Sequence, residues 1–117
     1  MWKNKLMPIS KKILKNTKVK GEPEDTSGEK YILQLFVTGI LQNSLRAIVN
    51  IKAICEKYLK DRYELEIIDI YQQPGLALSE NIIATPMLIK KFPLPEIRLI
   101  GDLSDTKSVL EGLSLFN

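Results

Sequence analysis

The sequence predicts one α/β domain of order βαβαββα, in which a parallel strand pair is followed by an antiparallel hairpin and a covering helix. Three observations predict this class: an apolar run at 31–37, apolar residues at helical spacing between 45 and 59, and two further apolar runs on either side of Pro93. The chain has 117 residues, enough for one modest core. We therefore expect a single domain, residues 31–117, preceded by an extension, residues 1–30.

The first half of the domain has the pattern strand, long helix, strand. Residues 31–37 are apolar at nearly every position, which is typical of a strand covered on both faces. Asn43 or Ser44 is expected to cap the following helix. The buried face of that helix is predicted from apolar residues three and four apart: Leu45, Ile48, Val49, Ile51, Ile54, Cys55, Tyr58 and Leu59. A second strand at 65–70 completes a βαβ unit with parallel strands.

The second half has the pattern short helix, strand, strand, helix. A turn at 72–75 and a short helix at 76–84 precede strands at 87–92 and 96–100. Ser104 or Asp105 is expected to cap a last helix, whose apolar residues are Val109, Leu110, Leu113 and Phe116. A parallel unit followed by a hairpin and a covering helix is the thioredoxin-like layout.

The positive charge of the chain lies in its first 30 residues. The formal charge is +3, but residues 1–30 hold eight lysines and four acidic residues, whereas residues 31–117 hold nine basic and ten acidic ones. We expect 1–30 to be a flexible basic extension, because its second half is polar and contains Gly and Pro. Contact of residues 1–14 with an acidic surface or a membrane is the alternative.

The residues needed for most catalytic chemistry are missing. The chain has no histidine, and Cys55 is its only cysteine, so a zinc cluster, an intramolecular disulfide and a C-x-x-C dithiol are excluded. No phosphate-binding glycine motif occurs. Asp102 and Asp105 offer oxygen ligands for a metal, but strand termination and helix capping explain them better. We expect no enzyme, no cofactor, no metal and a core position for Cys55.

The same composition limits the partners. A near-neutral domain lacks the basic stripe of a nucleic-acid binder. No apolar run approaches the roughly 20 residues of a transmembrane helix. The single cysteine fits a reducing cytoplasm, so we expect a cytoplasmic protein without nucleic-acid partners.

Four motifs in order resemble the KaiB family of circadian clock proteins. Residues 31–46 (YILQLFVTGILQNSLR) resemble the family opening, and 66–77 (EIIDIYQQPGLA) resemble its V-I-D-V-x-x-x-P-x-L-A segment. Residues 83–86 (IATP) and 98–105 (RLIGDLSD) match its next two motifs. The likeness extends over 31–116, including Val109-Leu110 and Gly112-Leu113 in the last helix.

The resemblance implies a non-catalytic adaptor. Proteins of this family bind the ATPase ring of KaiC, capture KaiA, and compete with a thioredoxin-like domain of a sensor kinase. They self-associate, so we expect a dimer or tetramer. They also change fold between the thioredoxin-like state and a second state of order βαββααβ. Slow X-Pro isomerisation could gate such a change.

The resemblance also suggests two sets of residues. Candidates for partner binding, expected to be exposed, are Arg46, Lys52, Lys57, Asn81, Lys90 and Arg98. Candidates for a structural switch are Pro86, Pro93, Pro95, Gly101, Asp102 and Gly112, the last because glycine weakens a helix by about 1 kcal/mol.

This sequence departs from the usual family pattern at several places. This chain has Leu41-Gln42 where family members usually have Thr-Pro, and Pro93-Leu94-Pro95 where they usually have three prolines in a row. The basic extension is also unusual for the family. Three alternatives therefore stay open: a clock-independent paralogue in stress adaptation or signalling, a sensory input module of a histidine kinase, and a small-thiol-binding relative of glutathione transferases.

Overall fold

The described part of the chain forms one mixed sheet with three helices. The computed structural model describes residues 29–115. Its elements are β3 (Tyr31–Val37), α1 (Gln42–Tyr58), β4 (Tyr63–Asp69), α2 (Pro74–Ser79), β5 (Met87–Phe92), β6 (Ile97–Ile100) and α3 (Thr106–Gly112). The predicted order βαβαββα is confirmed. The extension up to residue 28 and Phe116 lie outside the described residues.

The strand order of the sheet is β4-β3-β5-β6. β3 pairs with β4 in parallel, as the predicted βαβ unit requires, and β5 pairs antiparallel with both β3 and β6. β3 is therefore a central strand, which explains why its residues are apolar on both faces. The edges of the sheet are β4 and β6.

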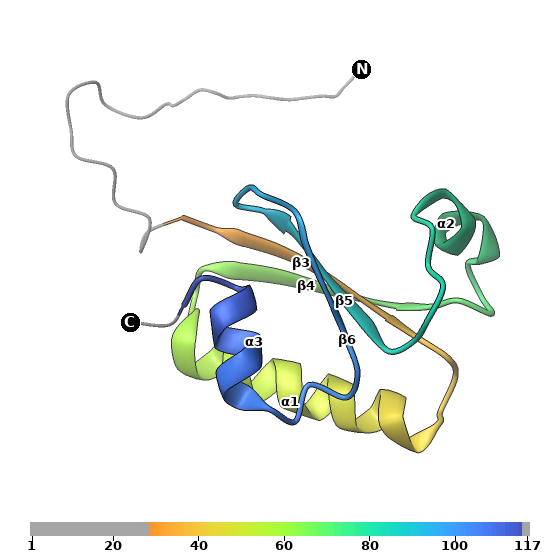
Figure 1. The fold of residues 1–117 in the computed structure, drawn as a ribbon, viewed down its shortest axis with the longest axis horizontal. Coiled ribbons are helices and arrows are strands. Elements are labelled where there is room, and N and C mark those ends of the chain that lie inside the picture. Colours follow the sequence, from red (N-terminus) through yellow and green to blue (C-terminus); the bar gives the residue numbers. More distant parts are fainter. Residues whose placement is uncertain (1–28, 116–117) are drawn as a thin grey trace.

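The two faces of the sheet are covered unequally. α1 and α3 pack on one face, and α2 lies on the other (Figure 1). The main core lies under α1 and α3 and includes Leu33, Leu35, Ile51 and Leu110. A smaller cluster on the α2 side is formed by Phe36, Ile68, Met87 and Ile89. The alternation of side chains along each strand separates the two clusters.

The start of α1 differs from the prediction. No side chain caps the helix, which begins at Gln42 after Leu41. Ser44 is buried instead, and its hydroxyl accepts a hydrogen bond from the backbone N–H of Thr38 at 3.1 Å. Asn43 accepts from Arg46 at 2.9 Å. The predicted caps were wrong because Ser44 already lies in the first turn, where its hydroxyl joins β3 to α1.

Several other boundaries shift by a few residues. β4 runs from Tyr63 to Asp69 rather than over 65–70, and α2 ends at Ser79 rather than at 84. α2 begins at Pro74, within the predicted turn, because proline suits the first position of a helix. β6 begins at Ile97 rather than Glu96, whose side chain instead contacts Lys91 and Arg98. The peptide bonds before Pro86, Pro93 and Pro95 are cis.

The last helix begins as the sequence predicts. The carboxylate of Asp105 accepts a hydrogen bond from the backbone N–H of Ser108, so Asp105 caps α3. Gly112 has a different role from the one expected. It is the final residue of α3, and a β-carbon there would lie 2.8 Å from Leu99 Cδ2. This glycine permits close packing of α3 on β6.

Candidate partner-binding surface

The start of α1, where a thioredoxin enzyme carries its dithiol, holds no sulfur. Residues 39–44 are Gly-Ile-Leu-Gln-Asn-Ser. Ser44 is buried beside β3, and the hydroxyl of Thr38 hydrogen-bonds to that of Thr85. Cys55 lies in the core, as predicted, and burial raises the pKa of its thiol to about 12. A thiol with this pKa is protonated at neutral pH and is a poor nucleophile.

The same end of α1 exposes a cluster of large apolar side chains. The exposed fractions are 85% for Ile40, 61% for Leu41, 48% for Leu45 and 65% for Val49. Leu45 and Val49 were predicted to be buried. They lie outside the arc of α1 that contacts the sheet, because that arc already holds Ala47, Ile51 and other core residues.

Three of these side chains, Ile40, Leu45 and Val49, line a groove between α1 and the loop that leads to α3. We call it the α1 groove; it has a volume of about 640 Å³ and is lined by Ile40, Gln42, Leu45, Arg46, Val49, Asn50 and Ser104. Asn50 donates a hydrogen bond to the backbone oxygen of Asp102 at 2.8 Å, which fixes the loop against the helix. A specific hydrogen bond therefore holds together the two walls of the groove, which are α1 and the loop before α3.

The loop beside the α1 groove carries two acidic residues, Asp102 and Asp105, on either side of Ser104. Asp102 accepts a hydrogen bond from the backbone N–H of Ser104, and hydrogen bonds from Ser104, assisted by the charge of Arg46, lower the pKa of Asp102. Hydrogen bonds from Ser108 lower the pKa of Asp105. Both carboxylates are ionised at neutral pH, and each is explained by its local turn. Among residues 29–115, no group of three potential metal-ligating side chains occurs.

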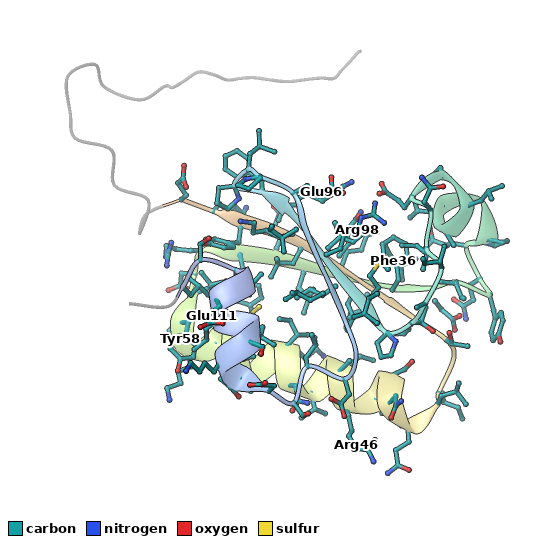
Figure 2. The ribbon with its side chains drawn as sticks, in the orientation of Figure 1. Phe36, Arg46, Tyr58, Glu96, Arg98 and Glu111 are labelled. Atoms are coloured by element: carbon teal, nitrogen blue, oxygen red, sulfur yellow. The ribbon has the colours of Figure 1, made fainter. Side chains whose placement is uncertain are left out.

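The six residues predicted for partner binding do not form one surface. Arg46, Lys52 and Lys57 are exposed on α1. Arg98 lies on the opposite side of the sheet (Figure 2). Its guanidinium donates to the backbone oxygen of Glu80 at 2.7 Å and pairs with the carboxylates of Glu80 and Glu96. Exposed Asn81 follows Glu80 in the chain, with a positive φ of 57°. The set therefore divides between two faces, and Arg98 already has intramolecular partners.

Lys90 corrects the prediction most clearly. It was expected to be exposed, but only 1% of the residue is accessible. Successive side chains of β5 point to opposite faces of the sheet, so Lys90 lies with Leu88 on the face covered by α1 and α3. Its Nζ is 6.0 Å from the centre of the Tyr31 ring. Burial lowers the pKa of Lys90. The sequence signal for the burial of Lys90 was the two-residue alternation of a strand, which places Lys90 on the same face as Leu88.

The residues predicted for a structural switch have ordinary local roles in this fold. Pro86 is buried, and Gly101 has a φ of +119°, which favours glycine. Asp102 holds its turn and Gly112 permits packing, as described above. Pro93 and Pro95 bound the turn between β5 and β6. Their part in a change of fold stays a prediction.

The exposed apolar cluster on α1 is the feature that sequence reasoning missed. The sequence signal was the width of the apolar stripe along the helix, because apolar residues at 45 and 49 extend that stripe beyond one face.

No helix within residues 29–115 has the length and apolar character needed to cross a membrane.

The fold and the start of α1 together define a class: a thioredoxin-like domain without the redox thiols of the enzymes. Solved structures with this fold include the N-terminal domain of SasA from Synechococcus elongatus, with a TM-score of 0.61, 23% identity, and coverage of 85% of this chain and 94% of that domain. Mitochondrial thioredoxin 3 from Saccharomyces cerevisiae matches with a TM-score of 0.60 and 12% identity over 75% of this chain and 80% of that one.

Sequence comparison identifies the family. The model of the KaiB domain matches residues 34–115. The circadian clock protein KaiB3 of Synechocystis is 46% identical over 86 residues, covering 74% of this chain and 84% of that protein. The clock oscillator protein KaiB of Prochlorococcus marinus subsp. pastoris is 49% identical over 85 residues, covering 73% and 79%. The chain belongs to the KaiB family, and the KaiB circadian clock proteins that it matches are non-catalytic clock components.

Proposed function

We propose that this protein is a KaiB-type adaptor that docks on a KaiC-type ATPase through the outer surface of α1. Family membership supports the kind of partner. The observation that supports the surface is the exposed apolar cluster at Ile40, Leu41, Leu45 and Val49. Contiguous apolar groups of this size on a small domain are typical of protein interfaces.

The charges on the helix side of the cluster suit an acidic partner surface. Arg46 lines the α1 groove, and Lys52 and Lys57 continue along the exposed side of the same helix. An apolar centre with cations at its rim is the usual arrangement of a transient interface, where the rim charges speed encounter and set specificity. Arg98 and Asn81 are left out of this contact, because they lie on the other side of the sheet.

The test is size-exclusion chromatography with light scattering on the full-length protein mixed with the KaiC-type ATPase of its host and ATP. We expect a ring decorated by this protein. Val49→Asp should prevent decoration, because it places a charge in the apolar centre. Leu78→Asp is the matched control, because Leu78 is 79% exposed on α2, and it should bind as well as the wild type.

Each other outcome has a defined meaning. No complex at high micromolar concentration would overturn the ATPase as partner and leave a clock-independent paralogue. Loss of binding in Leu78→Asp but not in Val49→Asp would keep the partner and move the contact to the α2 side. Complex formation over minutes to hours would support the change of fold known in the family, whereas rapid formation would argue against it.

A further inference from the structure

The α1 groove lacks a covering element within residues 29–115. Its three large apolar side chains remain between 48% and 85% exposed, and its volume of about 640 Å³ lies in the range of binding clefts, roughly 300–1,000 Å³. Asp102 and Asp105 lie on the loop beside the groove, on either side of Ser104, whereas Arg46 is the charged side chain among those that line it. A fitting occupant is therefore apolar where it meets the helix and basic where it meets the loop.

The chain itself contains a segment with this chemistry. Residues 1–14 include four lysines together with large apolar side chains, namely Trp2, Leu6, Met7, Ile9, Ile13 and Leu14. This segment lies before residue 34, where the match to the KaiB domain begins. It is therefore additional to the family domain, and its composition complements the apolar lining of the groove and the acidic loop beside it.

The geometry permits the segment to reach the groove of its own molecule. Residues 15–28 link it to the domain, and fourteen residues span up to about 46–50 Å when extended. β3 runs from Tyr31 to Val37, which is about 20 Å at the rise of a strand, and the groove begins at Ile40. A short tether of this kind gives an effective concentration of the order of mM, so even a weak contact is populated.

We propose that residues 2–14 bind the α1 groove of the same molecule, with apolar side chains against Leu45 and Val49 and lysines towards Asp102 and Asp105. The segment then covers the surface assigned above to the ATPase. Competition between the two occupants rests on the proposed function, whereas the intramolecular contact does not.

Trp2 is the only tryptophan of the chain, so its fluorescence reports on this segment alone. In the full-length protein, without any partner, we expect an emission maximum blue-shifted from that of N-acetyl-tryptophanamide and reduced quenching by acrylamide. Val49→Asp and Leu6→Asp, one on each side of the contact, should both return emission and quenching to the values of the free compound. Leu78→Asp, which changes a leucine that is 79% exposed outside the groove, should leave them unchanged.

A mixing experiment separates this contact from exchange between two molecules. The Val49→Asp chain keeps Trp2 but lacks a good groove, and the Trp2→Phe chain keeps the groove but lacks the fluorophore. Mixed in equal amounts, they should show the free emission of the Val49→Asp chain. A blue shift on mixing would overturn the intramolecular contact in favour of a second copy. Wild-type emission equal to that of the free compound would overturn the proposal entirely, even if the ATPase binds.

Discussion

Lys90 carries a positive charge into the core beneath α1 and α3, and this burial has a cost in stability. The side chain is inaccessible, and burial lowers the pKa of its ammonium group. Lys90→Met keeps most of the length of the side chain and removes the charge. We expect the variant to be more stable to urea by about 1–2 kcal/mol at pH 7, because a buried charge is replaced by an apolar group of similar volume.

The pH dependence of this gain has a defined sign. Between the lowered pKa of Lys90 in the folded state and about 10.4 in the unfolded state, the unfolded chain binds more protons, so the wild type gains stability as pH rises. The advantage of Lys90→Met should therefore shrink between pH 7 and pH 10. Tyr31, Arg62 and Glu29 are present in both chains, so the comparison isolates Lys90. An advantage that grows with pH would contradict this account.

Asp105 caps the N-terminus of α3 and so contributes to the stability of this helix. Its carboxylate accepts hydrogen bonds from the backbone N–H and the hydroxyl of Ser108. Asp105→Ala should lower the melting temperature, whereas Asp105→Asn should keep most of it, because asparagine is an equally good capping residue. The pKa of Asp105 is lowered in the folded state, so its contribution is present above about pH 4 and is lost at lower pH. Thermal melts of the Asn variant should lack this part of the acid sensitivity.

Two helical glycines should respond oppositely to the same change. Gly75 in the first turn of α2 has open space around its missing β-carbon, whereas Gly112 is in close contact with Leu99. Gly75→Ala should stabilise the protein by about 0.5–1 kcal/mol, because alanine restricts the unfolded chain. At Gly112 the leucine must move, and overpacking opposes that gain. Urea unfolding should place Gly112→Ala below Gly75→Ala by about 1 kcal/mol, and equal values would refute the packing role of Gly112.

The elements could be predicted from sequence because their patterns are local. The bounds of β3 and β5 coincide with the apolar runs at 31–37 and 87–92, and Asp105 is the predicted cap. What sequence could not provide was the width of the contact between α1 and the sheet. Helical spacing alone did not distinguish buried Ile51 from exposed Val49, because that depends on where the neighbouring layer ends. The candidate partner-binding surface consists of residues of α1 whose exposure the helical spacing could not determine.

The two edges of the sheet differ in their readiness to pair with a second copy. The β4 edge carries the exposed acids Glu64 and Glu66, and edge charges oppose strand addition. The β6 edge carries one charged side chain, Arg98, which is paired with Glu80 and Glu96, and it is bordered by exposed apolar side chains, namely Phe92, Leu94 and Ile100. If the protein forms the dimer or tetramer expected from its family, pairing of two β6 edges about a twofold axis is therefore the favoured contact.

Light scattering over a range of protein concentrations tests this arrangement of the whole molecule. Ile100→Lys should shift the equilibrium towards the monomer, because it places a like charge on both copies beside the paired edges. Leu78→Lys adds the same charge on α2, away from either edge, and should leave the oligomer intact. Equal dissociation in both variants would attribute the effect to net charge. A wild type that is monomeric at every concentration would remove the need for the β6 contact and leave both edges without a partner copy.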